Sequence, residues 1–373
     1  MKRVCSLLLS LLIIICDINI VKAADVTVSA SSAILYCPDN RQVYFSKNEK
    51  TKSKIASTTK IMTALLTLEY AKDNNKKVKF TNDMTAEGSS MYLKIGEVVT
   101  LKDLAVGILL CSGNDAANAA AISIAGSLEK FAKLMNNRGK QIGMKDTNFV
   151  TPSGLDHQDH YSTAYDMALL MAVALENPDF RRISSMKSAT VNFTKPKDKL
   201  ATYSNHNRLL STYPYCISGK TGYTMASGRC LVTASKKDGL TLICVTLNDR
   251  QDWKDHTALY NYGYENYVMD KLDDRDVYYE VDTVGGEYST TTLGGNGVTK
   301  VVLKAEDINK VKRKVYLDNF IYAPVSDGDK VGTIVYTLNK EVIAKHSIIA
   351  VNYNNKRKSN FFEYIKGIFN NAI

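Results

Sequence analysis

The sequence lacks the features of several common protein classes. Its amino-terminal apolar run, Val4–Cys16, is too short to cross a membrane comfortably. His157 and His160 have no third ligand at helical spacing and no H-E-x-x-H motif beside them, which argues against zinc. There is no recognised nucleic-acid-binding module and no local signature of a Cys/His nucleophile. We therefore expect no metal, no cofactor and no nucleic-acid partner.

The amino terminus has the pattern of a signal peptide. Lys2 and Arg3 precede the apolar run, and Val21-Lys22-Ala23 ends in the small residue that a cleavage site requires. A lipoprotein signal ending at Cys16 is the alternative, but the bulky Ile15 stands where such signals have a small residue. We expect residues 1–23 to be removed and the mature protein to be exported.

The cysteines argue against a disulfide framework. Of the seven in the chain, two lie in the expected signal peptide, which leaves five, an odd number. A chain of this length also buries enough apolar surface without covalent links. We expect mostly buried free thiols at Cys37, Cys111, Cys216, Cys230 and Cys244.

Three short motifs occur in one order along the chain. They are Ser57-Thr58-Thr59-Lys60, Ser112-Gly113-Asn114 and Lys220-Thr221-Gly222. The first pattern alone is weak, because S-x-x-K recurs at Ser127–Lys130 and Ser184–Lys187. The ordered set is far more specific, and it contains the residue types of a serine acyl-transfer site whose general base is a lysine.

The spacing of the first motif suits that chemistry. Three residues apart on a helix, Ser57 and Lys60 share one face, so the amine can reach the hydroxyl that it must deprotonate. The following run from Ile61 to Leu68 is apolar on most sides, which predicts a central helix. Burial and nearby cations then lower the lysine pKa, and the helix start favours negative charge on the serine oxygen. A capping serine followed by a solvated lysine remains the alternative for this motif alone.

The second and third motifs have different predicted settings. Ser112-Gly113-Asn114 falls between the apolar stretch Leu104–Leu110 and an alanine-rich helix, in a tight connection that points side chains into a cleft. A simple turn with a helix cap is the alternative there. Lys220-Thr221-Gly222 lies in a predicted strand, 215–224, followed by a hairpin with an Asp-Gly turn. A strand edge can dock an extended peptide, although an edge lysine is also a common guard against aggregation.

The motifs resemble those of the serine-type D-alanyl-D-alanine carboxypeptidases, the low-molecular-weight penicillin-binding proteins of the peptidase S11 type. The resemblance extends through nearly the whole mature chain and includes the segments 56–64, 88–93, 112–117, 154–156, 160–167 and 218–224. It implies an α/β (α+β) catalytic domain of the penicillin-recognising, serine transpeptidase/β-lactamase-like fold.

The resemblance also implies a role for each motif residue. Ser57 would be the acylated nucleophile, Lys60 its base, Ser112 the proton shuttle, Asn114 the anchor of the substrate amide, Lys220 and Thr221 the clamp on the terminal carboxylate, Gly222 the space for the ligand backbone, and the backbone N–H groups of Ser57 and Tyr223 the oxyanion hole. Two positions depart from the family pattern. Ile55 replaces the usual proline, and Asp255 stands where some relatives have a cationic substrate contact, for which Arg250 is a candidate substitute.

The chain changes character near residues 269–276. Short predicted strands separated by Gly-rich and Asp-Gly turns follow, at 277–281, 297–303, 315–320, 330–338 and 341–351. They predict a small all-β sandwich that resembles the second domain of this carboxypeptidase group. We expect a catalytic domain at 24–272, a β-sandwich at 273–352 and a tail at 353–373 that forms an amphipathic membrane-anchoring helix.

The tail has the pattern of an amphipathic membrane-surface helix. Phe361, Ile365 and Phe369 fall on one helical face, and the basic cluster Lys356-Arg357-Lys358 precedes them. A helix packed on the protein's own β domain is the alternative. The net charge is +10 for the full chain, and loss of Lys2, Arg3, Lys22 and Asp17 with the signal peptide leaves +8 (10 − 3 + 1). The exported chain therefore suits anionic surfaces, so we expect peripheral attachment to the outer face of the bacterial cytoplasmic membrane.

The expected function is removal of the terminal D-Ala from peptidoglycan stem pentapeptides through an acyl-enzyme on Ser57. β-Lactam antibiotics are the expected covalent inhibitors at the same serine. A β-lactamase of the same fold is one alternative, disfavoured by the lack of a Glu-based water-activating motif. A catalytically inert wall-binding protein is the other.

Overall fold

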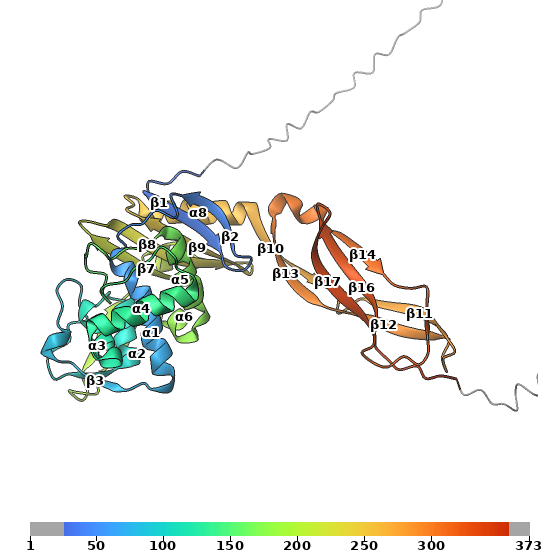
Figure 1. Cartoon of the computed structure of the whole chain (residues 1–373), viewed down its shortest axis with the longest axis horizontal. Helices are drawn as coiled ribbons and strands as arrows, with labels where there is room; N and C mark the ends of the chain where they lie inside the picture. Colours follow the sequence, from blue (N-terminus) through green and yellow to red (C-terminus); the bar gives the residue numbers. More distant parts are fainter. Residues whose placement is uncertain (1–25, 358–373) are drawn as a thin grey trace, which may run out of the picture.

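The structure is a computed structural model that describes residues 26–357. The expected signal peptide and the apolar face of the expected C-terminal helix lie outside these residues. The chain forms an elongated molecule in which a mixed α/β domain is followed by a β domain, as Figure 1 shows. The two meet where helix α8 runs into strand β10, so a single passage of the chain connects them.

An antiparallel five-stranded sheet lies at the centre of the first domain. Its order is β2-β1-β9-β8-β7, formed by β1 (Ser32–Cys37), β2 (Gln42–Lys47), β7 (Cys216–Thr224), β8 (Gly228–Lys237) and β9 (Leu240–Leu247). The predicted β8–β9 hairpin is confirmed: Asp238 and Gly239 both have positive φ, as a two-residue type I′ turn requires. Strand β7 is at the edge of the sheet, which confirms the predicted strand setting of the third motif.

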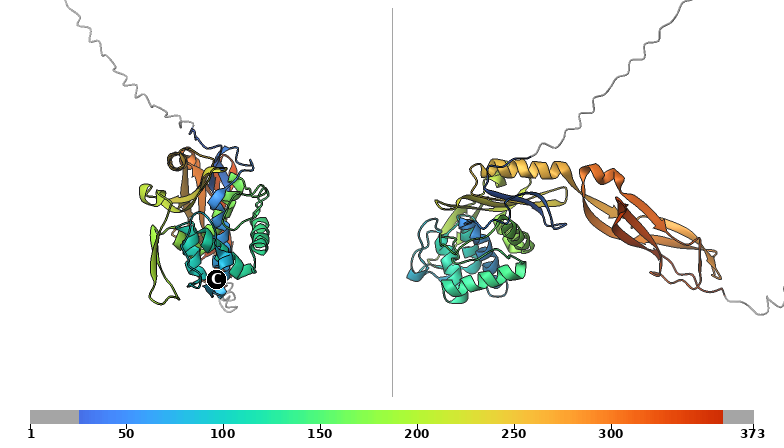
Figure 2. Two further views of the ribbon diagram at one scale, coloured as in Figure 1. Left: turned by 90° about the vertical axis from the view of Figure 1, so that its left-hand side faces the viewer. Right: turned by 45° about the horizontal axis from the view of Figure 1, so that its top comes forward.

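The two faces of this sheet carry separate hydrophobic cores. Successive side chains of a strand point to opposite faces, so Leu35 of β1 packs in the cluster that contains Leu259 and Tyr260 of α8. Its neighbour Ile34 belongs to the other cluster, with Met62 of α1. In Figure 2 the sheet accordingly lies between α8 on one side and the remaining long helices on the other.

The helical side of the domain is built from six helices. They are α1 (Lys60–Asp73), α2 (Leu101–Leu109), α3 (Asn114–Ala125), α4 (Leu128–Ile142), α5 (Ala164–Glu176) and α6 (Pro178–Ser184), with α8 (Asp252–Asn266) on the opposite face. Helix α1 is buried on most sides, as predicted. Local sequence fixes several helix ends: Thr100 and Asp103 form a capping box at α2, and Asn177 caps α6 just before Pro178.

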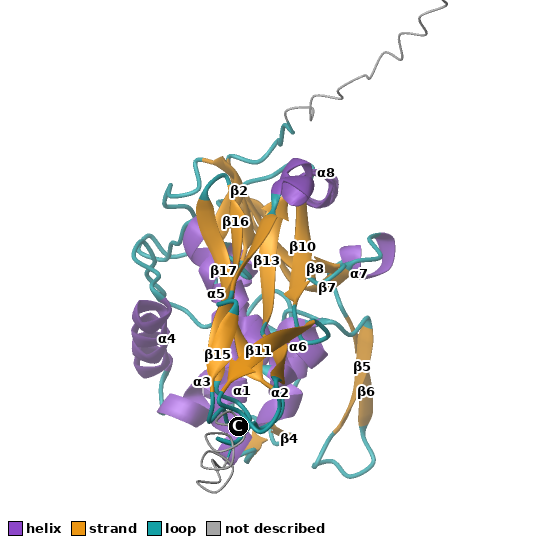
Figure 3. Cartoon of the chain, turned by 90° about the vertical axis from the view of Figure 1, so that its right-hand side faces the viewer, coloured by secondary structure: helices purple, strands orange, loops and turns teal. Residues whose placement is uncertain are grey.

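Short elements complete the first domain. They are the two-stranded ribbons β3 (Lys77–Lys79) with β4 (Val98–Thr100) and β5 (Ser188–Asn192) with β6 (Leu200–Ser204), the helix α7 (Leu209–Thr212), and the 3₁₀ turns η1 (Ala56–Thr59) and η2 (Asn82–Met84). Figure 3 shows the β5–β6 ribbon projecting from the body of the domain.

The β domain contains more strands than the sequence predicts. Its elements are β10 (Tyr267–Asp273), β11 (Tyr278–Val284), β12 (Thr290–Asn296), β13 (Val298–Lys304), η3 (Ala305–Lys310), β14 (Lys312–Tyr316), β15 (Phe320–Tyr322), β16 (Lys330–Leu338) and β17 (Glu341–Ala350). A six-stranded sheet, β14-β16-β17-β12-β11-β15, is accompanied by the pair β10–β13. Strand β12 escaped prediction because its second half is Gly-Gly-Asn, a sequence typical of a turn.

The ends and cysteines of the described region add three findings. Asn354 and Lys356, which fall within the segment 353–373 expected to be helical, instead form isolated bridges to Val325 and Gly286 of the β domain. The five cysteines are free and buried or partly buried, as expected. No helix between residues 26 and 357 is long and apolar enough to cross a membrane.

Candidate active site

The three motifs meet at the edge of strand β7. Ser57, Ser112, Thr221, Gly222 and Tyr223 all line one cavity of about 330 Å³. They come from η1, from the connection between α2 and α3, and from β7. Segments separated by more than a hundred residues therefore face one space large enough for a short peptide.

Ser57 and Lys60 are brought together by a 3₁₀ turn. Ser57 lies in η1, and Lys60 is the first residue of α1, so the serine precedes the α-helix that was expected to contain both. A 3₁₀ turn has three residues per turn, which aligns side chains i and i+3 more closely than an α-helix does. The Lys60 Nζ lies 2.9 Å from the Ser57 Oγ.

The surroundings of Lys60 favour a neutral amine. The side chain is fully buried, and burial, followed by the positive charge of Lys220, lowers the pKa of Lys60 well below its usual value. Its Nζ donates to the Asn114 Oδ1 and the Ser153 carbonyl oxygen, both at 2.6 Å. Those two oxygens can only accept. A neutral amine that donates to both directs its lone pair at the Ser57 hydroxyl.

Lys220 is a second buried cation with a different position. Only 1% of the residue is exposed, and its Nζ donates to the Thr221 carbonyl oxygen at 2.8 Å. Burial lowers the pKa of Lys220 to about 7. Because Lys60 is affected by burial and by the charge of Lys220, Lys60 is the amine that loses its proton first.

The second motif combines strain with anchoring. Ser112 has φ +61°, a left-handed conformation that is uncommon for serine and typical of functional turns. Asn114 is fixed by its side-chain N–H to the Glu87 carbonyl oxygen at 2.6 Å. The next residue, Asp115, accepts hydrogen bonds from the backbone of Met91 and from the Ser90 hydroxyl, both at 2.7 Å. Segment 87–93 is thereby held against the motif.

Two glycines allow backbone segments to approach the nucleophile. A Cβ on Gly222 would lie 3.0 Å from the Ser57 amide nitrogen, so a larger residue there would push β7 away from η1. Gly154 has φ +79°, and its Cβ would lie 2.0 Å from the Ala56 carbonyl oxygen. The Tyr223 side chain, by contrast, is largely exposed at the cavity.

His160 is a supporting residue of the site. Its Nδ1 accepts from the backbone N–H of Val150 at 3.0 Å, so the other ring nitrogen carries the proton that it donates to the Thr59 hydroxyl at 2.8 Å. Burial lowers the pKa of His160 to about 4, which keeps the ring neutral. The histidine ties the loop that presents the Ser153 carbonyl to the turn that carries Ser57.

The structure also places residues at the cavity that the motifs did not identify. Ser89, His206, Arg229, Asp252 and Trp253 complete its lining. For Arg229, the sequence offered one signal: in the register of the β7–β8 hairpin, Arg229 lies directly opposite Tyr223.

In the sequence, Asp255 and Arg250 are the two candidate positions for a cationic substrate contact. Neither residue lines this cavity. Asp255 is buried on α8, where its Oδ2 accepts from the Ser29 backbone N–H at 2.6 Å. Arg250 is exposed and is not among the lining residues.

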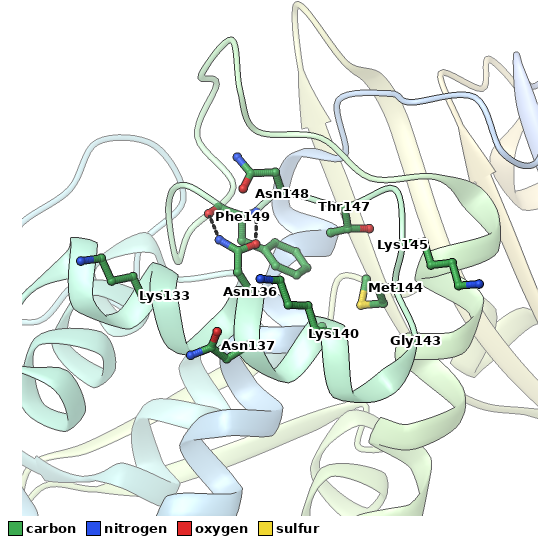
Figure 4. Close-up of a pocket in the computed structure, with 11 residues that line it drawn as sticks. Lys133, Asn136, Asn137, Lys140, Gly143, Met144, Lys145, Thr147, Asn148 and Phe149 are labelled. Carbon is green, nitrogen blue, oxygen red and sulfur yellow. Dashed lines mark hydrogen bonds between the residues drawn. The ribbon is translucent and has the colours of Figure 1, made fainter.

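A larger hollow of about 600 Å³ lies elsewhere, beside the end of α4. Figure 4 shows Lys140 near its centre and the Asn136 side chain bonded to the backbone of Phe149. It contains none of the residues of the three motifs.

The fold and the cavity define a serine hydrolase with a lysine beside its nucleophile candidate, and the comparisons identify its family. The sequence model of the D-alanyl-D-alanine carboxypeptidases (peptidase S11) matches residues 19–251, and that of the penicillin-binding protein 5 C-terminal domain matches residues 272–356. The chain belongs to the D-alanyl-D-alanine carboxypeptidase family of serine hydrolases. The family and the two-part fold predicted from the motifs are confirmed.

Individual relatives agree over most of their length. The chain is 31% identical to the D-alanyl-D-alanine carboxypeptidase DacF of Bacillus subtilis, covering 92% of this chain and 90% of the relative. It is 32% identical to DacC of Escherichia coli, covering 91% and 88%. Among solved structures, DacD of Francisella tularensis has a TM-score of 0.66 at 26% identity and covers 90% of this chain and 96% of its own. The β-lactamase and inert-protein alternatives gain no support from these relatives.

Proposed function

We propose that the cavity removes the terminal D-Ala from peptidoglycan stem pentapeptides through an acyl-enzyme on Ser57. The observation that carries this proposal is the buried Lys60 amine, 2.9 Å from the Ser57 hydroxyl and hydrogen-bonded to two oxygens that can only accept. That arrangement suits a base and not a structural ammonium, because it lacks any carboxylate partner among the described residues.

In the proposed acylation, Lys60 takes the Ser57 proton while Oγ attacks the carbonyl carbon of the penultimate D-Ala. The backbone N–H groups of Ser57 and Tyr223 would stabilise the oxyanion, a contribution of about 3 kcal/mol for one such donor. The peptide C–N bond then breaks. Ser112 passes the proton from Lys60 to the leaving amine, which departs as D-Ala. Asn114 orients both Lys60 and the substrate amide.

Deacylation uses the same groups in reverse order. Lys60, neutral again, activates a water molecule that attacks the ester carbonyl, and the Ser57–acyl bond breaks to give the tetrapeptide and free Ser57.

Lys220 and the Thr221 hydroxyl would bind the terminal carboxylate of the substrate. A β-lactam acylates the same serine, and its ring-opened product remains attached because deacylation is slow.

We also propose that the protein acts outside the cytoplasmic membrane, after removal of residues 1–23, with residues 361–372 lying on the anionic membrane surface. The basic cluster Lys356-Arg357-Lys358 and the apolar face that follows it support this placement. A chain truncated after residue 357 should lose sedimentation with vesicles containing anionic lipid. Unchanged sedimentation would refute the membrane role of the tail.

The experiment on the reaction itself measures D-Ala release from a synthetic stem pentapeptide and labelling by a fluorescent penicillin. We expect release, and a lasting penicillin adduct, from the natural chain. Ser57→Ala should abolish both, whereas Ser127→Ala, in another S-x-x-K sequence that lies at a helix end, should retain both. Release that persists in Ser57→Ala would refute the nucleophile, and rapid penicillin turnover would favour a β-lactamase.

A further inference from the structure

We propose that Arg229, oriented by Asp252, is a second cation for the terminal carboxylate of the substrate, acting beside Lys220 and Thr221. This inference rests on the proposed carboxypeptidase reaction. Asp255 and Arg250 do not line the cavity, so the contact between a cationic side chain and the substrate carboxylate is assigned to Arg229 of strand β8.

The register of the β7–β8 hairpin places Arg229 on the correct face. Arg229 pairs with Tyr223, and Leu231 pairs with Thr221. Directly opposite residues of an antiparallel pair, and residues two apart on one strand, project from the same face. Thr221, Tyr223 and Arg229 therefore share one face of the hairpin, and all three line the cavity that contains Ser57.

Asp252 fixes the guanidinium in one orientation. The Arg229 Nε donates to the Asp252 Oδ2 at 3.1 Å, and its Nη2 donates to Oδ1 at 2.8 Å and to Oδ2 at 2.9 Å. Asp252 is itself nearly fully buried and is held by the Trp253 backbone N–H at 2.9 Å. The Trp253 ring lies 5.9 Å from the guanidinium carbon, within the range of a cation–π contact.

The remaining edge of the guanidinium is available to a ligand. Across residues 26–357, Arg229 Nη1 has no hydrogen-bond partner, and 46% of the side chain is exposed. Nη1 carries two N–H donors. Donors in a fixed plane suit a carboxylate, and an oriented guanidinium loses less entropy on binding than a free one.

A second cation also compensates for the incomplete charge of Lys220. Its pKa of about 7 leaves this amine only partly charged near neutral pH. Arginine stays charged at every pH that a protein experiences. Asp252 cancels part of the Arg229 charge at a distance, but the N–H groups of Nη1 still present their positive ends to the cavity.

The test compares two thioester substrates. One is an acyl-D-alanyl thioester whose thiol leaving group carries a free carboxylate, and the other is its neutral methyl ester. The activated ester bond keeps both reactions measurable. For Arg229→Gln we expect kcat/KM to fall about 10- to 30-fold on the acid, the equivalent of one charge-assisted hydrogen bond, and less than twofold on the methyl ester.

Further variants separate binding from positioning. Arg229→Lys keeps the charge without the fork and should lose less than Arg229→Gln. Asp252→Asn should raise KM for the acid and leave kcat within twofold, and the double variant should be no worse than Arg229→Gln alone. Arg275→Gln is the matched control, because Arg275 donates to Asp273 through the same two nitrogens but lies in the β domain; it should leave both substrates unaffected.

The outcomes distinguish this inference from the proposed function. If the natural chain releases no D-Ala and takes no penicillin label, the proposed function fails. If the natural chain is active and Arg229→Gln loses nothing, or loses equally on the acid and the methyl ester, Arg229 does not bind the carboxylate. If Arg250→Gln lowers kcat/KM on the acid and Arg229→Gln does not, the carboxylate contact belongs to Arg250.

Discussion

Two buried clusters, one in each domain, have opposite kinds of partner. In the first domain, Lys60 and Lys220 are fully buried lysines whose hydrogen-bond partners are neutral oxygens. In the β domain, the buried carboxylate of Asp274 accepts from the Arg313 Nε at 3.0 Å, the Tyr336 hydroxyl at 2.8 Å and the His346 Nδ1 at 2.6 Å. A buried charge is costly unless it is paired. The unpaired lysines therefore indicate chemistry, whereas the satisfied carboxylate indicates structure.

The largest effect should come from removing one of the two unpaired lysines. Lys60→Met keeps the length of the side chain but removes the base, so we expect penicillin acylation to slow by about 10²- to 10⁴-fold. The free energy of unfolding should change little, because the loss of the amine's hydrogen bonds is offset by no longer burying a polar amine. Acylation kinetics and thermal unfolding test both parts. Near-normal acylation would mean that Lys60 is structural, as Asp274 is.

The next largest effect should come from removing the paired carboxylate. Asp274→Ala leaves Arg313, Tyr336 and His346 with unpaired donors, and breaking a buried pair in this way costs about 3–5 kcal/mol. Chemical denaturation of the full chain measures the loss, and penicillin labelling in the absence of denaturant should persist because the cavity is in the other domain. Asp273→Ala is the neighbouring control, since that carboxylate is paired at the surface. An equal loss in both variants would remove the distinction between the two aspartates.

The smallest effect concerns pH. Lys220 must be charged to hold a carboxylate, and its pKa of about 7 in the free enzyme means that protons leave as the pH rises above 7. We expect kcat/KM for a D-Ala-D-Ala peptide to fall about tenfold per pH unit there, while kcat stays level because the bound carboxylate keeps Lys220 protonated. In Lys220→Arg this alkaline fall should vanish, whatever the remaining activity. A kcat/KM that is flat from pH 7 to 9 in the natural enzyme would contradict this assignment.

Most of the architecture was predictable because its signals are local. The Asp-Gly turn specified the β8–β9 hairpin, and the apolar run after Lys60 specified a buried helix. Prediction failed where pairing between distant segments decides the structure. Strand β12 is stabilised by β11 and β17 on either side, which outweighs the turn preference of its glycines. Arg229 was missed for a related reason, since its partner Asp252 and its neighbour across the cavity, Ser57, are both distant in sequence.

The S-x-x-K sequence occurs at three sites, and the structure clearly separates the one at Ser57 from the one at Ser127. At Ser127 the side-chain oxygen accepts the backbone N–H of Lys130 at 3.2 Å, and that lysine is exposed, so the pair is a helix cap followed by a solvated charge. The ordered motifs in the sequence were enough to identify the family and to select Ser57 over Ser127. Only the tertiary structure could bury Lys60, align its lone pair through Asn114 and Ser153, and place Arg229 beside Thr221, because pKa and orientation depend on neighbours that are distant in sequence.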